Sequence, residues 1–308
     1  MSADLQSTAF TNENTAREAM EAVLWPDGPV CPRCGSLDRI GKVGGTSARP
    51  GLYYCGECKR QFTVTVGTIF ERSKVPLSKW WLAVHLLASS KKGISAHQLH
   101  RLLSVAYPTA WFMEHRISEA MRSGNLAPMG GAGGTVESDE TFIGRKDGSI
   151  KRRGHGHKNA VLSLVHHESG QVRSFHVNGT SAEDIVPIVK ANVAKENAMM
   201  TDEGGHYFTL GDHFASHESV SHKADEYVRG DVHTNTVEGY YSIFKRGMKG
   251  VYQHCSEKHL HRYLAEFDFR YNNRSRLGVE DKERASKIVR GATGKRLMYR
   301  RPNEANPA

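Results

Sequence analysis

Four of the five cysteines form two CxxC pairs, one in CPRCGS and one in YYCGECKRQF. Zinc favours four soft ligands in a tetrahedron, and each CxxC turn can present two thiolates to one ion. Clustered cysteines also favour a reducing compartment over a disulfide framework. The pattern therefore predicts a structural Zn²⁺ held by Cys31, Cys34, Cys55 and Cys58. Cys255 has no such pair and is interpreted as a packing residue.

Three acids further along the chain, Asp139, Asp202 and Glu238, each stand at the edge of an expected strand or helix. In TVESDETFIG, strand alternation puts Glu137, Asp139 and Thr141 on one face. Three carboxylates that converge at one end of a sheet could hold two Mg²⁺ ions, which prefer oxygen ligands. Two such ions can activate an attacking hydroxyl and stabilise the leaving oxygen of a phosphodiester.

Each acid also has an alternative. Glu137 or Glu140 could be the ligand in place of Asp139, and Glu203 could replace Asp202, which would then be a turn residue. The third acid, Glu238, could instead have a purely structural role in its helix. Asn235 could cap that helix, with Glu238 returning a bond in an arrangement like a capping box.

Length and charge limit the class of protein. The chain has 308 residues, enough for two or three domains, and a formal net charge of +9 with a pI of about 9.3. That excess points to a polyanionic partner, with nucleic acid the first candidate. No apolar run reaches 18 residues, so we expect no membrane-spanning helix. The polar N-terminus lacks the layout of a signal peptide, so export is not expected.

The composition along the chain suggests a succession of segments. We expect an N-terminal helix in 1–26, a zinc ribbon in 27–72, a helical module in 73–125, a Pro/Gly-rich linker in 126–134, an α/β domain in 135–293 and a basic tail in 294–308. Within the α/β domain we expect strands in 134–144, 158–169, 170–179 and 198–205, and helices in 181–193, 235–249 and 256–274.

The helical module resembles a helix-turn-helix. Ser95 can cap a first helix, a turn follows near SVAYP, and Thr109 can open a second helix. Arg101 and Arg116 would offer basic groups to DNA. A plain helical hairpin, whose apolar spacing would look the same, is the alternative.

Other basic residues could also meet DNA phosphates. Two follow the second cysteine pair, Lys59 and Arg60, although the ribbon could be a purely structural clip. Three lie in the glycine-rich loop 144–160, which could instead be a solvated hairpin tip: Lys151, Arg152 and Arg153. The same loop holds two histidines spaced i, i+2, a weak metal motif that we assign to no metal.

The order of these motifs resembles the zinc-ribbon DDE transposases of bacterial insertion sequences, of the ISXO2-like family. The ribbon, the helical module, SDETFIG, TDEGG and HTNTVEGYYSIFKRG follow one another over residues 15–275. The resemblance implies an RNase H-like catalytic core with a mixed sheet flanked by helices. It also implies that Asp139, Asp202 and Glu238 hold two Mg²⁺ or Mn²⁺ ions, with Asn235 the alternative third ligand.

Many members of this family have a Lys or Arg seven residues after the third acid, which here is Lys245. Seven residues are nearly two helical turns, so Glu238 and Lys245 share a face about 10 Å apart along the axis. Glu238 would hold a metal and Lys245 a DNA phosphate, with Arg246 and Lys249 extending the basic track.

The resemblance implies a cytoplasmic, nucleoid-associated enzyme that acts on transposon ends and target DNA as a dimer or larger homo-oligomer. It would hydrolyse a phosphodiester and then join the new 3′-OH to a target strand. Two rivals are a DNA-binding regulator whose acids are structural and an RNase H-like nuclease that never joins strands. An inactive transposase would keep the motifs without the activity.

Overall fold

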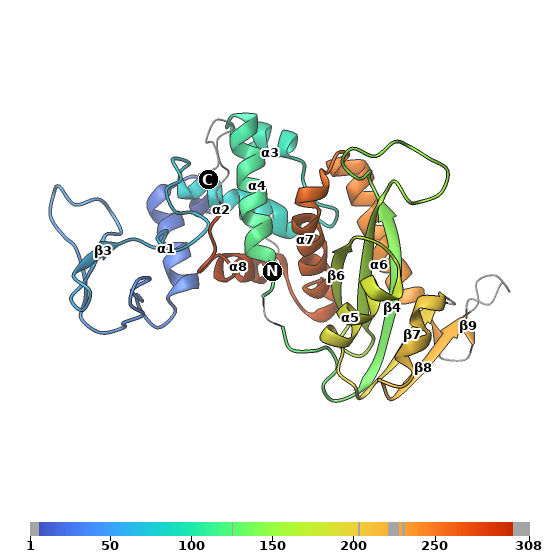
Figure 1. Ribbon diagram of the computed structural model, residues 1–308. Helices are drawn as coiled ribbons and strands as arrows, with labels where there is room; N and C mark the ends of the chain where they lie inside the picture. The colour runs from blue at the N-terminus through green and yellow to red at the C-terminus, as the bar shows by residue number, and fades with distance from the viewer. Residues whose placement is uncertain (1–5, 125, 203, 221–227, 230–231, 298–308) are drawn as a thin grey trace, which may run out of the picture. The chain divides into compact units, whose positions relative to one another are not determined.

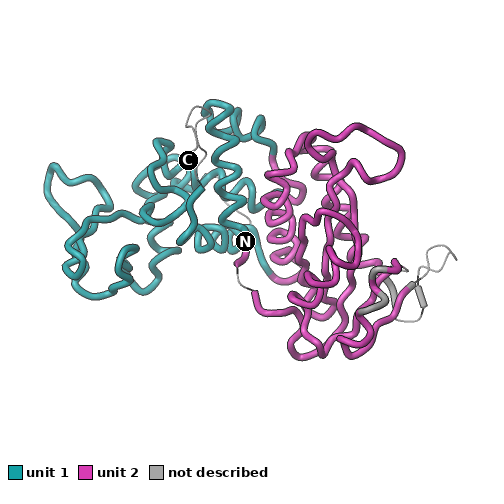
Figure 2. The backbone as a smooth tube through the Cα atoms, viewed as in Figure 1, with its two compact units in different colours: residues 1–90, 95–122, 279–308 teal, residues 91–94, 123–278 magenta. Residues whose placement is uncertain are grey.

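The computed structural model describes residues 6–124, 126–202, 204–220, 228–229 and 232–297. The chain divides into two compact units, drawn in different colours in Figure 2. Unit 1 contains residues 1–90, 95–122 and 279–308, and unit 2 contains residues 91–94 and 123–278. The cysteine pairs lie in unit 1 and the three acids in unit 2.

Unit 1 begins with helix α1 (Glu13–Leu24), followed by a three-stranded antiparallel sheet. Its strands are β1 (Ile40–Lys42), β2 (Tyr53–Cys55) and β3 (Arg60–Phe62), near the blue end of the chain in Figure 1. Trp25 closes α1 and packs its ring edge-on against Tyr53 and Phe62. The small sheet thus has an aromatic cluster beside its cysteines.

The rest of unit 1 is helical: α2 (Leu77–Ser89), α3 (Ala96–Leu103), α4 (Tyr107–Met121) and α8 (Asp281–Arg290). Ser95 caps α3 as expected, because its hydroxyl accepts from the Gln98 N–H while the Gln98 side chain returns a bond. Helix α4 begins two residues before the expected Thr109, with proline tolerated in its first turn. Within the described residues, no helix combines the length and apolar character that crossing a membrane requires.

Helix α8 is an element that the sequence analysis placed in the catalytic domain. It packs instead in unit 1, against α2, α1 and α4. Arg284 donates to the carbonyl of Ala88 at 2.7 Å and to that of Val279 at 3.0 Å. A Cβ at Gly291 would meet the carbonyl oxygen of Ala120 at 2.3 Å, so the close approach requires glycine. The compact core of unit 2 therefore ends near residue 278 rather than at 293.

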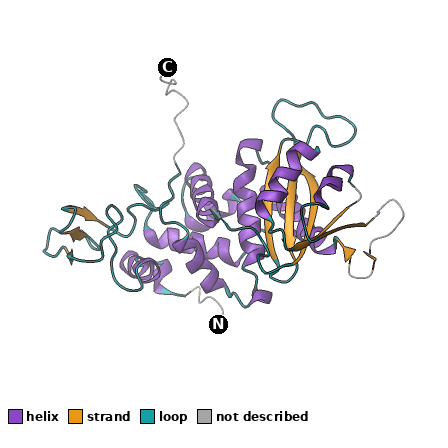
Figure 3. Ribbon diagram, turned by 60° about the horizontal axis from the view of Figure 1, so that its bottom comes forward, coloured by secondary structure: helices purple, strands orange, loops and turns teal. Residues whose placement is uncertain are grey.

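Unit 2 is built on a five-stranded sheet in the order β6-β5-β4-β7-β8 (Figure 3). The antiparallel strands are β4 (Gly134–Ile143), β5 (Asn159–His166) and β6 (Gln171–Val177). Strands β7 (Asn197–Asp202) and β8 (Ser216–Val220) run parallel to β4. The expected α/β class with a mixed sheet is confirmed, and β8 is a strand that the sequence analysis missed.

Helices cover both faces of this sheet. One face packs against α5 (Ala182–Asn192) and the short 3₁₀ helix Gly205–Leu210. The other packs against α6 (Asn235–Gly247) and α7 (Leu260–Asn272). Because both faces are covered, every residue of β5 is buried, and the strand reads as a nearly continuous apolar run. The remaining short elements are Thr8–Phe10, Val228–Arg229, Val232–His233, Met248–Tyr252, Glu257–His259 and Ser275–Leu277.

A polar network ties α6 and α7 to the edge of the sheet. The Asp268 carboxylate on α7 accepts bonds from the Tyr240 hydroxyl at 2.6 Å and from the Ser174 hydroxyl and N–H, each at 2.7 Å. Desolvation raises the pKa of Asp268 to about 6 against these three bonds, which favour the ionised form. Asp268 therefore has a structural role, in which it links α7 to α6 and to the edge strand β6.

We expect Asp268→Ala to lower the free energy of unfolding by about 3 kcal/mol, because it leaves the Ser174 N–H without an acceptor and removes the charged acceptor of the Tyr240 and Ser174 hydroxyls. Urea unfolding measures the loss. Asp212→Ala removes an exposed carboxylate from the same unit and should change stability by less than about 0.5 kcal/mol. Equal effects of the two substitutions would contradict the structural role.

Candidate metal-binding and catalytic site

The register of two parallel strands brings the first two acids together. Ser138 on β4 pairs with Thr201 on β7, so Asp139 and Asp202 are the next neighbours, on strands about 4.8 Å apart. The side chains of both point to the α6 side of the sheet, because Val136 and Met199, an odd number of residues away, pack on the α5 side. The sequence analysis predicted only that Asp139 shares a face of the strand with Glu137 and Thr141.

The third acid comes from the helix that covers this face. Glu238 lies in the first turn of α6, and the Tyr241 hydroxyl on the same helix donates to the carbonyl of Asp139. Desolvation and the charges of Glu140, Asp202 and Glu238 raise the pKa of Asp139 to about 7, although the Glu140 N–H donates to its Oδ1 at 2.7 Å. The three predicted acids therefore act on one another electrostatically at one place.

This cluster of carboxylates suits a divalent cation. Like charges that raise one another's proton affinity are relieved by a hard cation with oxygen ligands. Asp202 also has the turn role that the sequence left open, since its Oδ1 accepts from the Gly204 N–H at 2.9 Å. Among the described residues, the group whose ligand atoms all lie within 4.8 Å of one another is that of the four cysteines. The three acids are outside that limit, so their carboxylates lie further apart than the thiols do.

Glu137, a candidate ligand in place of Asp139, instead makes hydrogen bonds to the first turn of α6. Its fully buried carboxylate accepts from the N–H groups of Val237 at 2.7 Å and Thr236 at 3.3 Å, and from the ring of His167. A strand residue thus caps the helix that carries Glu238 and meets the positive end of its dipole. Strand β4 therefore contributes twice: Asp139 belongs to the acid cluster, and Glu137 fixes the helix that carries Glu238.

Asn235 does not form the capping box that its position in the sequence suggested. The N-cap of α6 is Thr234, with no side-chain cap bond, and Asn235 is exposed in the first turn. Glu140, a candidate ligand in place of Asp139, accepts from the Tyr207 hydroxyl on the α5 side of the sheet. Glu203, the candidate in place of Asp202, lies outside the described residues.

Lys245 lies on α6, two turns after Glu238. Desolvation lowers its pKa, while the charges of Asp139 and Glu238 act in the opposite direction. Its ammonium also lies 5.7 Å from the centre of the Tyr241 ring. The lysine is therefore within the electrostatic reach of the acids, as the helical spacing predicted.

The cysteines of unit 1 form one cluster. Cys31 Sγ lies 3.6 Å from Cys58 Sγ, and Cys34 Sγ lies 3.7 Å from Cys55 Sγ. A tetrahedral zinc with four thiolates places its sulfur atoms about 3.8 Å apart, given a Zn–S length of about 2.3 Å. Burial opposes ionisation of Cys31, but the N–H groups of Arg33 and Cys34 lower its pKa to about 7. The donor set and its spacing fit zinc.

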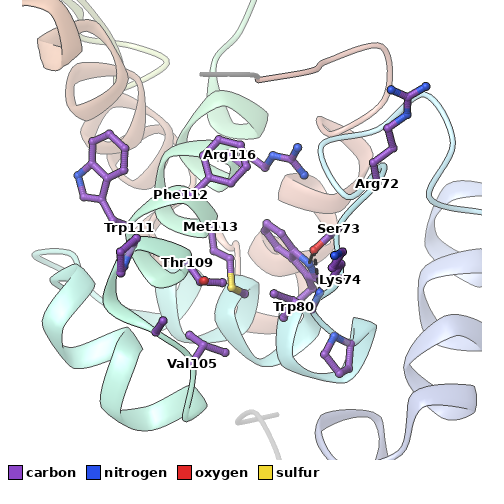
Figure 4. A pocket seen from close by; sticks show the side chains of 14 residues that line it. Arg72, Ser73, Lys74, Trp80, Val105, Thr109, Trp111, Phe112, Met113 and Arg116 are labelled. Carbon is purple, nitrogen blue, oxygen red and sulfur yellow. Dashed lines mark hydrogen bonds between the residues drawn. The ribbon is translucent and has the colours of Figure 1, made fainter. Parts of the chain in front are cut away.

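Most of the basic residues predicted to meet DNA are exposed: Lys59, Arg60, Arg101, Lys151, Arg152, Arg153, Arg246 and Lys249. Arg116 is the exception. It is buried in unit 1, donates to the carbonyls of Ile69 at 2.6 Å and Glu71 at 3.3 Å, and lies over the Phe112 ring. Figure 4 shows this side chain at a groove of about 960 Å³ beside α4. Its role in the structure is to hold the segment before α2.

Comparison with known proteins identifies the class. Residues 131–272 match the ISXO2-like transposase domain, and residues 11–61 match the transposase zinc-ribbon domain. These two matches identify an ISXO2-like transposase domain and a transposase zinc ribbon in the chain, in the order that its motifs indicated. The five-stranded mixed sheet with helices on both faces agrees with the RNase H-like core that the resemblance implies.

The chain is also similar to individual proteins. An uncharacterized protein in the transposable element ISH50 of Halobacterium salinarum is 28% identical over 279 residues, which cover 85% of this chain and 91% of the relative. The HTLV-2 integrase catalytic core domain in complex with magnesium matches 46% of this chain and 86% of its own, at 12% identity and a TM-score of 0.26. A simian T-cell lymphotropic virus intasome in complex with the PP2A regulatory subunit B56 gamma matches 55% and 63%, at 12% identity and a TM-score of 0.29.

The Glu137–His167 pair predicts a pH dependence of stability. The hydrogen bond that His167 donates to the Glu137 carboxylate raises the pKa of His167 above its ordinary 6.5. The protonated ring stabilises the folded state, so this contribution is complete below 6.5 and is lost as pH rises through the folded-state pKa. We expect urea unfolding across the histidine titration range to show this loss in the wild type and not in His167→Gln.

His254→Gln, which removes an exposed histidine of the same unit, is the matched control and should keep the wild-type slope. If His167→Gln also keeps that slope, the pair does not couple protonation to folding.

Proposed function

We propose that this protein is the transposase of an insertion sequence, which cuts and joins DNA at the site formed by Asp139, Asp202 and Glu238. The observation that carries the proposal is the convergence of these acids from two parallel strands and one helix, with mutual electrostatic effects. The family match supports the same class of reaction.

In this proposal the three acids hold two Mg²⁺ or Mn²⁺ ions. Bound there, such ions supply a nucleophilic hydroxide and neutralise charge on the phosphodiester oxygens. Glu137 fixes the helix that carries Glu238, and Tyr241 ties that helix to the backbone of Asp139. These residues hold the oxygen ligands in place before DNA arrives.

Two displacements at phosphorus follow in the proposal. A water oxygen first bonds to the phosphorus at the transposon end, the P–O3′ bond breaks, and a free 3′-OH and a 5′-phosphate result. That 3′-OH then attacks a target phosphodiester, and the target's own O3′ leaves. The Lys245 ammonium would hold a phosphate beside the cut, with Arg246 and Lys249 continuing along the backbone.

DNA is the proposed partner of both units. The exposed basic residues of unit 1, Lys59, Arg60 and Arg101, would contact the terminal repeats, while Lys151, Arg152 and Arg153 would contact DNA beside the catalytic site. Arg116 is left out because its guanidinium is committed to carbonyls of its own unit. Joining two ends in concert would require a homodimer or a larger assembly.

We propose Zn²⁺ as the ion of the cysteine cluster. Cys55→Ser removes a fully buried ligand and should abolish zinc binding and order in β2 and β3, because ribbons of this size depend on metal for folding. Native mass spectrometry measures the zinc, and hydrogen exchange measures the strands. Cys255→Ser is the matched control and should retain one zinc ion. A Cys55→Ser protein with full zinc content would refute the assignment.

The decisive test of function uses DNA that carries the repeats flanking the gene, a target plasmid, and protein with and without Mg²⁺. We expect metal-dependent cuts at the repeat ends and joined products. Asp202→Asn should lower both by on the order of a thousandfold, about 4 kcal/mol in the barrier. Strand-resolved product mapping measures each step.

Lys245→Ala is the companion variant and should weaken cutting while leaving metal dependence in place. Tight repeat binding without cuts under any metal would favour a regulator or an inactive transposase. Cuts without joined products would favour a nuclease.

A further inference from the structure

A groove of about 590 Å³ opens beside the acids, wholly within unit 2. Its walls are the second half of β4, the end of the loop before β5, and the C-terminal end of α6 with the turn that follows it. The volume lies within the range of about 300 to 1,000 Å³ that is typical of small-molecule sites. One wall residue, Glu140, directly follows Asp139 in the chain.

The groove is lined by cations of the kind that bind phosphate. Lys158, Lys245 and Lys249 line it from three different positions on the chain. Lys245 lies on α6, the helix that also carries Glu238, so one helix connects the cationic lining to the third acid. A nucleic-acid strand that reaches the acids would therefore have its neighbouring phosphates beside this groove.

An aromatic pair forms another part of the lining. The rings of His155 and Phe142 stack with their centres 4.5 Å apart and their planes 13° from parallel. Phe142 is partly buried on β4, whereas His155 is exposed, so the outer ring presents a flat surface to solvent. Nucleic-acid bases stack on such rings regardless of sequence.

An unsatisfied polar atom points to a ligand with a donor group. Asn159 lines the groove and is 2% exposed, yet its Oδ1 has no hydrogen-bond partner among the described residues. Its Nδ2 makes a long bond of 3.4 Å to the carbonyl of Arg145. A buried acceptor without a donor costs free energy, so such atoms in native proteins need an explanation. An amino group of a ligand in the groove would supply the missing donor.

Backbone strain occurs at the same place. Gln253, which lines the groove, has a φ of 58°, a left-handed conformation that is unfavourable for a residue with a side chain. Residues in such conformations cluster at binding sites, where the surrounding structure holds them.

We propose that this groove receives one unstacked nucleotide of the DNA strand next to the cut. Its base would lie on His155, an exocyclic amino group would donate to Asn159 Oδ1, and the flanking phosphates would meet Lys158 and Lys249. The proposal rests on the proposed function, because it assumes that DNA reaches the acids. Stacking on the protein offsets the few kcal/mol that extraction of a base from the duplex costs.

Photo-cross-linking tests the contact without requiring catalysis. Repeat-end DNA carrying 5-iodocytosine at each position flanking the cut, one at a time, is bound to the full-length wild-type protein without divalent metal and irradiated. We expect one position to cross-link strongly to the peptide that holds Phe142 or His155. Cross-links from all positions alike, or to other peptides alone, would overturn the proposal.

Variants test the effect on cleavage. His155→Ala should slow cutting by about fivefold or more, since stacking of a base contributes about 1 to 3 kcal/mol. His155→Phe should restore the rate, because it keeps a flat ring and removes only the imidazole nitrogens. Ile150→Ala, in the same loop and 73% exposed, is the control and should cut at the wild-type rate.

The two failures are distinguishable. If the wild type cuts and His155→Ala cuts equally fast, the nucleotide site is wrong and the transposase proposal stands. If no variant cuts DNA but the single-position cross-link appears, the nucleotide site stands and the proposed catalysis fails.

Discussion

The structure of unit 2 depends on one buried carboxylate. Glu137 lies at the centre of the sheet and accepts two N–H groups from the first turn of α6, 99 and 100 residues later in the chain. A buried carboxylate without partners would cost several kcal/mol. Glu137 therefore depends on the N-terminal end of α6 and on His167, just as it holds both of them in place. The bond links the strand of Asp139 to the helix of Glu238 and sets the spacing between these two acids. Tyr241 adds a second link, from the helix back to the backbone of Asp139.

The sequence predicted the parts of this arrangement that depend on local pattern. Alternation in TVESDETFIG placed Asp139 and Glu137 on one face, and Ser95 could be recognised as a cap because its partner lies three residues away. The resemblance of motif order pointed to Asp202 and Glu238. The features that the sequence did not predict depend on contacts between residues far apart in the chain. Nothing near Asn235 shows that a distant strand residue caps its helix, so local pattern could offer only Asn235 as a possible cap.

The same limit explains why the burial of two charged side chains does not follow from the sequence, and why Arg116 was wrongly predicted to meet DNA. Arg116 and Asp268 have charged side chains, and charged residues are usually exposed. Their burial depends on carbonyls and hydroxyls from other elements, such as Ile69 for Arg116 and Tyr240 for Asp268. A sequence pattern shows how many groups a side chain can bond, but not which partners the fold will bring to it.

The position of α8 has a consequence for synthesis of the chain. Unit 1 starts at the N-terminus but needs residues after 278 to complete its helical core, and Arg284 of α8 donates to the carbonyl of Ala88 on α2. Residues after 278 must therefore be synthesised before the helical core of unit 1 can close. A chain truncated within unit 2 would keep the ribbon and helices α1 to α4 but lack α8. In such a fragment the faces of α1, α2 and α4 that pack against α8 would be exposed to solvent, and exposed apolar surface of that kind promotes aggregation.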